Sequence, residues 1–266
     1  MVRALFIAAL FFTMTPLLIV AQWLLVKLGL PGWGVIAVNY YRALCSALRI
    51  RVRVVGEPVR EHAVLFVSNH VSWADILAIG SIIPIAYVSK SEIAGWPLVG
   101  TAAKAQRTVF VDRSRRHQTG DAIAEIVKRL AGGTSVVLFA EGTSSDGNRV
   151  LPFRSALMGA VKEASERAES GILIQPMSIC YTGLNGIPMG RQHRPTVAWY
   201  GDLDFVPHIK AFIERGAVDA VVSYGERVAA DGTADRKAMT RSLEGAVRKI
   251  TSDTLRGRPR PVHAGG

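Results

Sequence analysis

The N-terminal part of the chain is dominated by apolar positions. Residues 4–26 contain no charged side chain, and Arg3 and Lys27 bracket this stretch. Its length is sufficient for a helix that crosses a bilayer, which needs about 20 apolar residues. The next segment, residues 33–48, mixes aromatic with aliphatic side chains and is typical of an amphipathic helix in the membrane interface. We therefore predict that residues 1–49 form membrane-anchoring helices, which either span the bilayer or insert shallowly.

Beyond residue 49, short apolar runs alternate with amphipathic segments. The alternating residues 50–55 are typical of an edge strand, and the continuous apolar run 134–140 is typical of a buried one. Apolar residues recur on one face of 120–131, which predicts a helix that the following two glycines end. This alternation indicates an α/β domain over residues 50–255, with a mostly parallel sheet flanked by helices. The further predicted strands are 63–67, 85–88, 107–111, 172–180, 196–200 and 218–224, and the further helices are 155–169 and 235–251.

The composition narrows the possible partners. Lysine and arginine number 32 against 21 aspartates and glutamates, which gives a formal net charge of +11. Such a basic protein suits nucleic acid, anionic lipid surfaces or acidic substrates. The hydrophobic content of 49% favours an anionic membrane surface. No zinc-finger spacing or ribonucleoprotein motif indicates nucleic acid, so we expect no nucleic-acid partner.

The charge pattern also predicts a location. Four arginines between residues 42 and 53 follow the apolar segments, so the positive-inside rule predicts a cytoplasmic main domain attached to the cell inner membrane. A cleavable signal peptide is the main alternative, but the apolar region is too long and no clear small-x-small site follows. Cys45 and Cys180 form no CxxC pattern, which fits a reducing compartment. Residues 256–266 are rich in Gly, Pro and Arg, and we expect a basic flexible tail.

The segment Asn-His-Val-Ser-Trp-Ala-Asp at 69–75 carries the first candidate chemistry. Two residues five apart on one helix lie roughly 140° apart around its axis, so His70 and Asp75 can meet only if His70 lies outside the helix. Ser72 and Asp75 match the S-x-x-D capping pattern, which predicts Ser72 as the N-cap and Asp75 in the first turn. A carboxylate-oriented imidazole in a loop is how a protein builds a general base near neutral pH. The alternative is a plain helix cap beside a polar loop histidine.

Two further polar clusters follow predicted strands, where an α/β sheet places its ligand site. Arg113 follows the strand 107–111, and its planar guanidinium is suited to a phosphate or a carboxylate. The alternative is a surface arginine paired with Asp112. Glu141 and Gly142 follow the buried strand 134–140 and would let the backbone and a carboxylate approach a substrate. The alternative there is a plain turn.

Together these residues resemble the glycerolipid acyltransferase family, which includes 1-acylglycerol-3-phosphate acyltransferase. The H-x4-D block of the family matches residues 69–75 in full, and its F-V-x-R block matches 110–113. Its F-P-E-G-T-R-S block is present at 139–145 as Phe-Ala-Glu-Gly-Thr-Ser-Ser, and its late V-x-P block at 174–176 as Ile-Gln-Pro. The four blocks occur in the family's order over residues 68–179, and the rest of the chain matches only in general layout.

The resemblance implies an O-acyltransferase that moves a fatty acyl group from a thioester to the hydroxyl of a lyso-lipid. It implies His70 as the base and Asp75 as the residue that orients it. It implies substrate binding by Arg113, Glu141, Gly142 and Thr143. The donor would be a thioester of acyl carrier protein or of coenzyme A, and we expect neither a metal nor a further cofactor. No G-x-S-x-G elbow occurs in the chain, which favours direct transfer without an acyl-enzyme.

One departure from the family bears on the acceptor. Ser144 stands where the family has the arginine that is thought to hold the acceptor's phosphate. The run from Glu141 to Arg149 resembles the bacterial lyso-ornithine lipid acyltransferase branch, whose acceptor carries a carboxylate and an ammonium group. We therefore expect Arg113 to bind the carboxylate and Glu141 or Asp146 to bind the ammonium. Lysophosphatidate stays open as an alternative or second acceptor, with Arg149 or Arg154 replacing the missing arginine.

Two other classes of function compete with acyl transfer. A membrane-tethered lipid-binding protein with an inactive site is disfavoured by the intact His70, Asp75, Arg113 and Glu141. A serine hydrolase of lipid esters is disfavoured by the missing nucleophile elbow.

Overall fold

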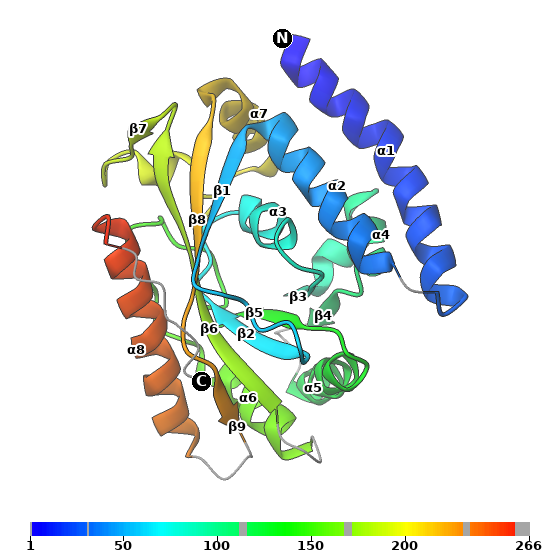
Figure 1. Ribbon diagram of the computed structural model, residues 1–266, viewed down its shortest axis with the longest axis vertical. Helices are drawn as coiled ribbons and strands as arrows, with labels where there is room; N and C mark the ends of the chain where they lie inside the picture. The colour runs from blue at the N-terminus through cyan, green and yellow to red at the C-terminus, as the bar shows by residue number, and fades with distance from the viewer. Residues whose placement is uncertain (1, 31, 112–115, 168–171, 231–234, 259–266) are drawn as a thin grey trace.

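Figure 1 shows the computed structural model of the chain, in which helices cover a twisted central sheet. The structure describes residues 2–30, 32–111, 116–167, 172–230 and 235–258. Over these residues the sheet has nine strands in the order β1-β8-β6-β2-β5-β3-β4, and β7 and β9 pair with β6. Their bounds are β1 Ile50–Val55, β2 Val64–Ser68, β3 Ala86–Lys90, β4 Val109–Val111, β5 Val136–Phe139, β6 Ile172–Leu184, β7 Ile187–Pro188, β8 Val218–Tyr224 and β9 Val228–Ala230.

The centre of the sheet is parallel and fully buried. Strand β2 lies between β5 and β6, is parallel to both, and buries all five of its residues. Its continuous apolar run suits this position because both of its faces are covered. Strand β8 is antiparallel to β6 and pairs in parallel with the edge strand β1. The predicted α/β fold with a mostly parallel sheet is therefore confirmed.

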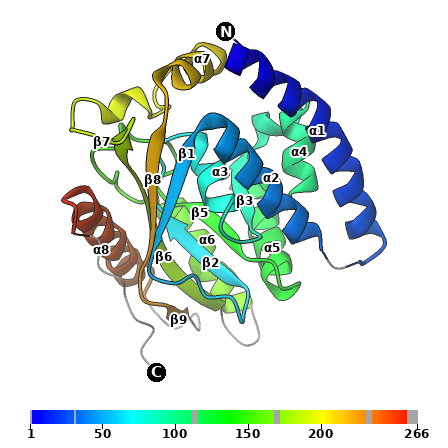
Figure 2. The ribbon, with the colours of Figure 1, turned by 45° about the horizontal axis from the view of Figure 1, so that its top comes forward.

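Helices cover both faces of the sheet, and Figure 2 shows α2 and α8 on opposite sides of it. One core lies under α2, α3 and α7 and contains Leu48, Ile79 and Phe212. The other lies under α5, α6 and α8 and contains Ile123 and Met158. The helices are α1 Val2–Lys27, α2 Trp33–Leu48, α3 Ala74–Gly80, α4 Val99–Ala105, α5 Arg116–Ala131, α6 Ser155–Arg167, α7 Phe205–Arg215 and α8 Arg236–Leu255, with short 3-10 helices η1 Ser91–Gly95 and η2 Arg194–Thr196.

The predicted strand at 196–200 is wrong. The chain forms η2 and then continues without a strand to Tyr200. The backbone N–H of Trp199 donates to the carbonyl of Val71 at 2.9 Å instead of joining a ladder. The apolar residues of this segment are therefore buried against the loop that follows β2, which local periodicity cannot distinguish from burial in a sheet.

Helix α1 has two polar side chains buried on its inner face and several large apolar side chains exposed on its outer face. Thr15 and Gln22 are almost fully buried. The Thr15 hydroxyl is hydrogen-bonded to that of Tyr40, and the Gln22 amide to that of Gln106. The apolar side chains on the outer face are more than 60% exposed: Leu5, Phe6, Phe12 and Leu17.

This inverted arrangement suits a nonpolar surrounding better than water, because large exposed apolar patches are rare on soluble proteins. Residues 5–27 of α1 are also long and apolar enough to cross a membrane, judged by length and composition. Helix α1 thus suggests that the protein associates with a membrane.

Candidate active site

His70 and Asp75 meet at the carboxyl end of the central strand. Strand β2 ends at Ser68 and α3 begins at Ala74, so His70 lies in the connection and Asp75 in the first helical turn. The Nδ1 atom of His70 lies 2.7 Å from Oδ2 of Asp75. The His70 side chain is 20% exposed and the Asp75 side chain is fully buried. The structure thus brings together the two residues that the H-x4-D spacing singles out, with the imidazole at the surface of the site.

Three further donors hold the Asp75 carboxylate. Its Oδ2 accepts the backbone N–H groups of Val71 at 2.7 Å and Ser72 at 3.0 Å. Its Oδ1 accepts the hydroxyl of Tyr181 at 2.8 Å. Burial, followed by the nearby Asp75 carboxylate, raises the pKa of Tyr181 well above its ordinary value, so the phenol keeps its proton and donates it. With all these donors directed at it, Asp75 has a single position from which to orient the imidazole.

Ser72 does not have its predicted role. Helix α3 begins after Trp73, and the Ser72 hydroxyl is buried without a hydrogen-bond partner among the described residues. Only the return half of the capping box forms, in which the Asp75 carboxylate accepts the Ser72 N–H. The Asp75 carboxylate also binds the His70 imidazole, so the hydrogen bonds of this loop converge on Asp75 and not on the Ser72 hydroxyl.

The hydrogen bond to Asp75 determines which nitrogen of His70 can act as a base. Because a carboxylate only accepts, Nδ1 carries the proton and Nε2 has the free lone pair. Nε2 has no hydrogen-bond partner among the described residues. The imidazole stacks on the ring of Phe139 with their centroids 4.1 Å apart. The ring is therefore fixed on one face and at one nitrogen, and its other nitrogen is left for a substrate proton.

Glu141, just after the neighbouring strand β5, supports the same loop. Its Oε2 accepts the backbone N–H of His70 at 3.2 Å, and its Oε1 accepts that of Leu151 at 2.8 Å. The residue is almost fully buried, and this burial raises the pKa of Glu141 to about 8 against the opposing effect of the two N–H donors. Its described hydrogen bonds are thus to the backbone of His70 and Leu151, and its predicted contact with substrate stays a prediction.

The other predicted binding residues lie beside this loop or outside the described residues. Gly142 has a φ of +72°, a conformation that favours glycine, and Thr143 is exposed next to it. The N–H of Ser145 donates to the carbonyl of His70 at 2.9 Å, which ties this turn to the His70 loop. Arg113 falls in the segment 112–115, outside the described residues.

Two contributors to the site were not predicted, Tyr181 and Asn69. The Asn69 amide donates to the carbonyl of Ile179 and accepts its N–H, both at 2.9 Å, and so extends the pairing of β2 with β6 by its side chain. Both contributions depend on β6 lying beside β2, with Ser68 in register with Met177. A sequence signal would require the strand order to be known beforehand. Over the described ranges, no group of three or more His, Cys, Asp or Glu side chains could hold a metal ion.

The sequence of the chain matches a known protein family. A family model described as Acyltransferase matches residues 51–180. The chain is 43% identical over 85% of its length to a lyso-ornithine lipid O-acyltransferase of Rhizobium meliloti, of which it covers 78%. It is 42% identical to one of Brucella abortus, with 92% of each chain covered. A 1-acyl-sn-glycerol-3-phosphate acyltransferase of Neisseria meningitidis matches at 28% identity over 80% of the chain and 79% of its own.

A solved structure shares the fold. The crystal structure of the 1-acyl-sn-glycerophosphate acyltransferase of Thermotoga maritima superposes with a TM-score of 0.63 over 95% of this chain and 96% of that one, at 19% sequence identity. The likeness extends to the N-terminal helices because it covers nearly the whole of both chains.

Proposed function

The chain belongs to the acyltransferase family, and from this premise we propose that it transfers a fatty acyl group from a thioester to the free hydroxyl of lyso-ornithine lipid. The observation that carries the proposal is the His70 imidazole, held by a buried carboxylate at 2.7 Å with Nε2 unpartnered among the described residues. Such a pair supplies a general base for an alcohol, which is a weak nucleophile until its proton is removed.

His70 and Asp75 divide the chemistry between them. As the acceptor oxygen forms its bond to the thioester carbonyl carbon, its proton passes to Nε2 of His70. The buried Asp75 carboxylate stabilises the imidazolium that results. When the carbon–sulfur bond breaks, the leaving thiolate takes that proton, and the histidine returns to its starting state. One histidine thus acts as base and then as acid, and no acyl-enzyme is required.

The acceptor is proposed from the most similar named relatives and from residue 144. The two relatives at 42–43% identity are named lyso-ornithine lipid O-acyltransferases. Ser144 stands where the family's F-P-E-G-T-R-S block has the arginine that is thought to hold the acceptor's phosphate. The absence of this arginine supports an acceptor that carries a carboxylate. Lysophosphatidate is the second candidate acceptor, because 1-acyl-sn-glycerol-3-phosphate acyltransferases also match the chain.

The donor is proposed to be a thioester of an acidic carrier, either acyl carrier protein or coenzyme A. A basic groove of about 810 Å³ lies between α2 and β1, and the arginines that line it are Arg42, Arg49, Arg51 and Arg60. Its described lining includes no acidic side chain, but Arg51 forms an ion pair with Asp219 at 2.6 Å, so the positive charge of the groove comes from Arg42, Arg49 and Arg60. The groove extends to Ser81, which follows α3, and His70 precedes the same helix. Because α3 is about 10 Å long, this end of the groove lies about one helix length from the His70 loop.

The membrane side of the proposal rests on α1 and on the arginines that follow it. The exposed apolar face of α1 would contact lipid, and the arginine-rich β1 that comes after α2 supports a cytoplasmic main domain on the inner membrane. A lyso-lipid acceptor would then reach His70 from the bilayer to which the protein is attached.

An acyl-transfer assay with the full-length protein in mixed micelles tests the proposal. Lyso-ornithine lipid and lysophosphatidate are each offered with acyl carrier protein and with coenzyme A thioesters. We expect lyso-ornithine lipid to be acylated at a higher kcat/KM, and His70→Ala to abolish transfer to either acceptor. His62→Ala, at an exposed position between β1 and β2, is the matched control and should retain activity. Acylation of lysophosphatidate alone would refute the proposed acceptor, and full activity of His70→Ala would refute the mechanism.

A further inference from the structure

The segment that carries Arg194 lies against the His70 loop. The Trp199 N–H donates to the carbonyl of Val71 at 2.9 Å, and the Ser144 hydroxyl donates to the carbonyl of Trp199. Gly147 separates Val71 from Arg194 so closely that an added Cβ there would lie 3.2 Å from Val71 Cγ1 and 3.6 Å from Arg194 Cβ. Ser144, which stands where the family has an arginine, thus binds the segment that carries Arg194.

The guanidinium of Arg194 is largely unpaired. Its Nη1 donates to Oδ1 of Asn148 at 3.2 Å. Its Nε is buried and has no hydrogen-bond partner among the described residues. Within the described part of the chain, no carboxylate forms an ion pair with it. A guanidinium has five N–H donors, and among the described residues Arg194 uses one of them, on Nη1, so its Nη groups are suited to receive an anion.

The positive charge of Arg194 acts on Cys180, a buried residue that the charge of Asp75 also affects. Burial raises the pKa of the Cys180 thiol to about 12, while Arg194 lowers it and Asp75 raises it. Both charges are therefore within electrostatic range of one thiol. The neighbouring residue, Tyr181, donates to Asp75. Arg194 thus belongs to the same end of the sheet as the catalytic pair.

Other arginines near the Glu-Gly-Thr turn are less suited to this role. The Nε of Arg154 already donates to the carbonyl of Glu141 at 3.3 Å, and Arg149 is exposed to solvent. A guanidinium whose Nη groups keep free N–H donors can bind both oxygens of a carboxylate at once. Arg194 combines such free donors with partial burial.

We propose that Arg194, in place of the Arg113 expected from the sequence, binds the carboxylate of the acceptor's headgroup and so replaces the arginine that is absent at position 144. The inference rests on the proposed function, because it names the residue that recognises the proposed acceptor. Arg194 would determine acceptor specificity without taking part in proton transfer.

The test compares lyso-ornithine lipid with its carboxyl methyl ester, which lacks the negative charge, in steady-state assays of the full-length protein. We expect the wild type to show a KM for the ester that is about tenfold or more above the KM for the acid. Arg194→Met should raise the KM for the acid to that of the ester and leave the KM for the ester and for the donor unchanged. Arg194→Lys keeps the positive charge but loses the planar guanidinium, so its KM for the acid should lie between those of the wild type and Arg194→Met.

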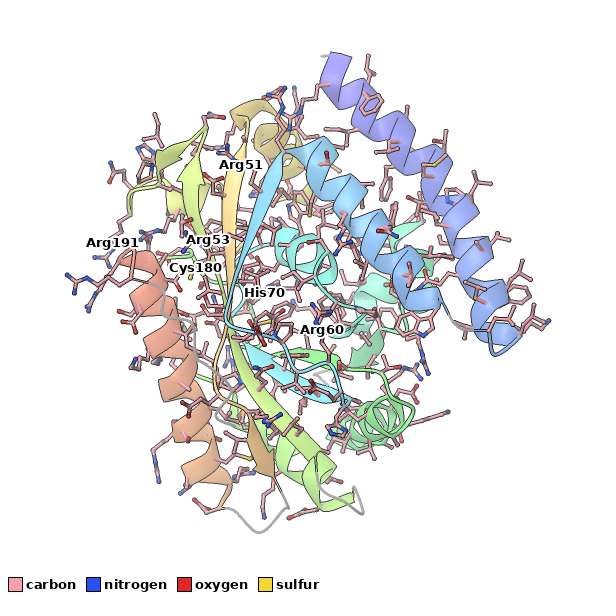
Figure 3. The ribbon with its side chains drawn as sticks, in the orientation of Figure 1. Arg51, Arg53, Arg60, His70, Cys180 and Arg191 are labelled. Carbon is pink, nitrogen blue, oxygen red and sulfur yellow. The ribbon has the colours of Figure 1, made fainter. Side chains whose placement is uncertain are left out.

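Arg191→Met is the matched control, since Arg191 is exposed in the same segment and Figure 3 shows it pointing away from the molecule. It should keep the wild-type preference. Equal use of acid and ester by the wild type, or an unchanged preference in Arg194→Met, would overturn the role of Arg194 while acyl transfer stands. If the wild type leaves lyso-ornithine lipid untouched, the proposed acceptor fails first and the role of Arg194 fails with it. If Arg194→Met does not fold, Arg194→Lys with wild-type preference would overturn the inference and an intermediate preference would support it.

Discussion

The hydroxyl of Tyr181 donates a hydrogen bond of 2.8 Å to the carboxylate of Asp75, across 106 residues of sequence. Tyr181 comes from β6 and Asp75 from the first turn of α3. This bond holds the oxygen of Asp75 that does not bind His70, so the core of the sheet directly supports the carboxylate that orients the imidazole. It makes the stability of the fold and the geometry of the site interdependent.

Removing that hydroxyl should weaken both properties. Tyr181→Phe keeps the ring in the core but loses one hydrogen bond to a buried carboxylate, so we expect a loss of about 1–3 kcal/mol in the free energy of unfolding. We also expect a reduced kcat, because Asp75 would be held less tightly. Thermal unfolding in detergent and steady-state kinetics measure the two effects. Tyr224→Phe is the control: that hydroxyl is buried without a partner among the described residues, so its removal should change little.

Neutralising the orienting carboxylate should affect turnover more than folding. Asp75→Asn retains the size of the side chain, but it removes the charge that stabilises the imidazolium and allows the other histidine tautomer. We expect kcat to fall by about 10²–10⁴-fold with a smaller change in the acceptor KM. Asp253→Asn, on α8 beside Lys249, should leave kcat unchanged. A kcat for Asp75→Asn within twofold of wild type would exclude the proposed role of this carboxylate.

The raised pKa of Glu141 predicts a pH-dependent stability. A carboxyl group with an ordinary pKa of 4.5 and a folded-state value of about 8 keeps its proton in the folded state while the unfolded chain has lost it. Stability from this group is therefore full below pH 4.5 and declines as the pH rises to about 8, by a few kcal/mol in total. Asp75 adds to the raised pKa, while Arg248 and the N–H groups of His70 and Leu151 oppose it.

Glu141→Gln should lack this decline because an amide does not titrate. Melting temperatures measured from pH 5 to 9 should show the wild type losing stability relative to Glu141→Gln as the pH increases. Glu61→Gln, at an exposed position, should follow the wild-type curve at every pH. Parallel curves for wild type and Glu141→Gln would contradict the raised pKa.

Charges on the outer face of α1 should weaken membrane attachment. Phe12 and Leu17 are each more than 60% exposed on this helix. A charged residue in the middle of a membrane helix costs about 2.5–3.5 kcal/mol, so Phe12→Asp with Leu17→Asp should shift the protein from sedimenting membranes to the supernatant. Ile187→Asp is the control, because Ile187 is as exposed but lies on β7, away from α1 (Figure 1). Equal sedimentation of all three proteins would argue against lipid contact by this face.

Local pattern predicted much of the fold. Strands β1 and β8 and helix α2 have the predicted bounds, because each is a run whose periodicity or apolar continuity is complete within itself. The segment 196–200 has an equally apolar character but belongs to no strand, since Trp199 pairs with the His70 loop. The short helices α4 and α7 were not predicted. Periodicity reports that a residue is buried, not which element covers it.

The sequence by itself determined the pair His70 and Asp75, because residues five apart at a strand-to-helix connection can meet through local geometry alone. Only the tertiary structure decided that Tyr181 holds the second oxygen of Asp75, that Glu141 turns inward to the backbone of His70, and that Arg194 borders the site. These contacts join segments from about 45 to more than 100 residues apart, and those of Tyr181 and Glu141 exist because β6 and β5 flank β2 in the sheet. Strand order arises from the packing of the whole domain, so no short stretch of sequence contains it.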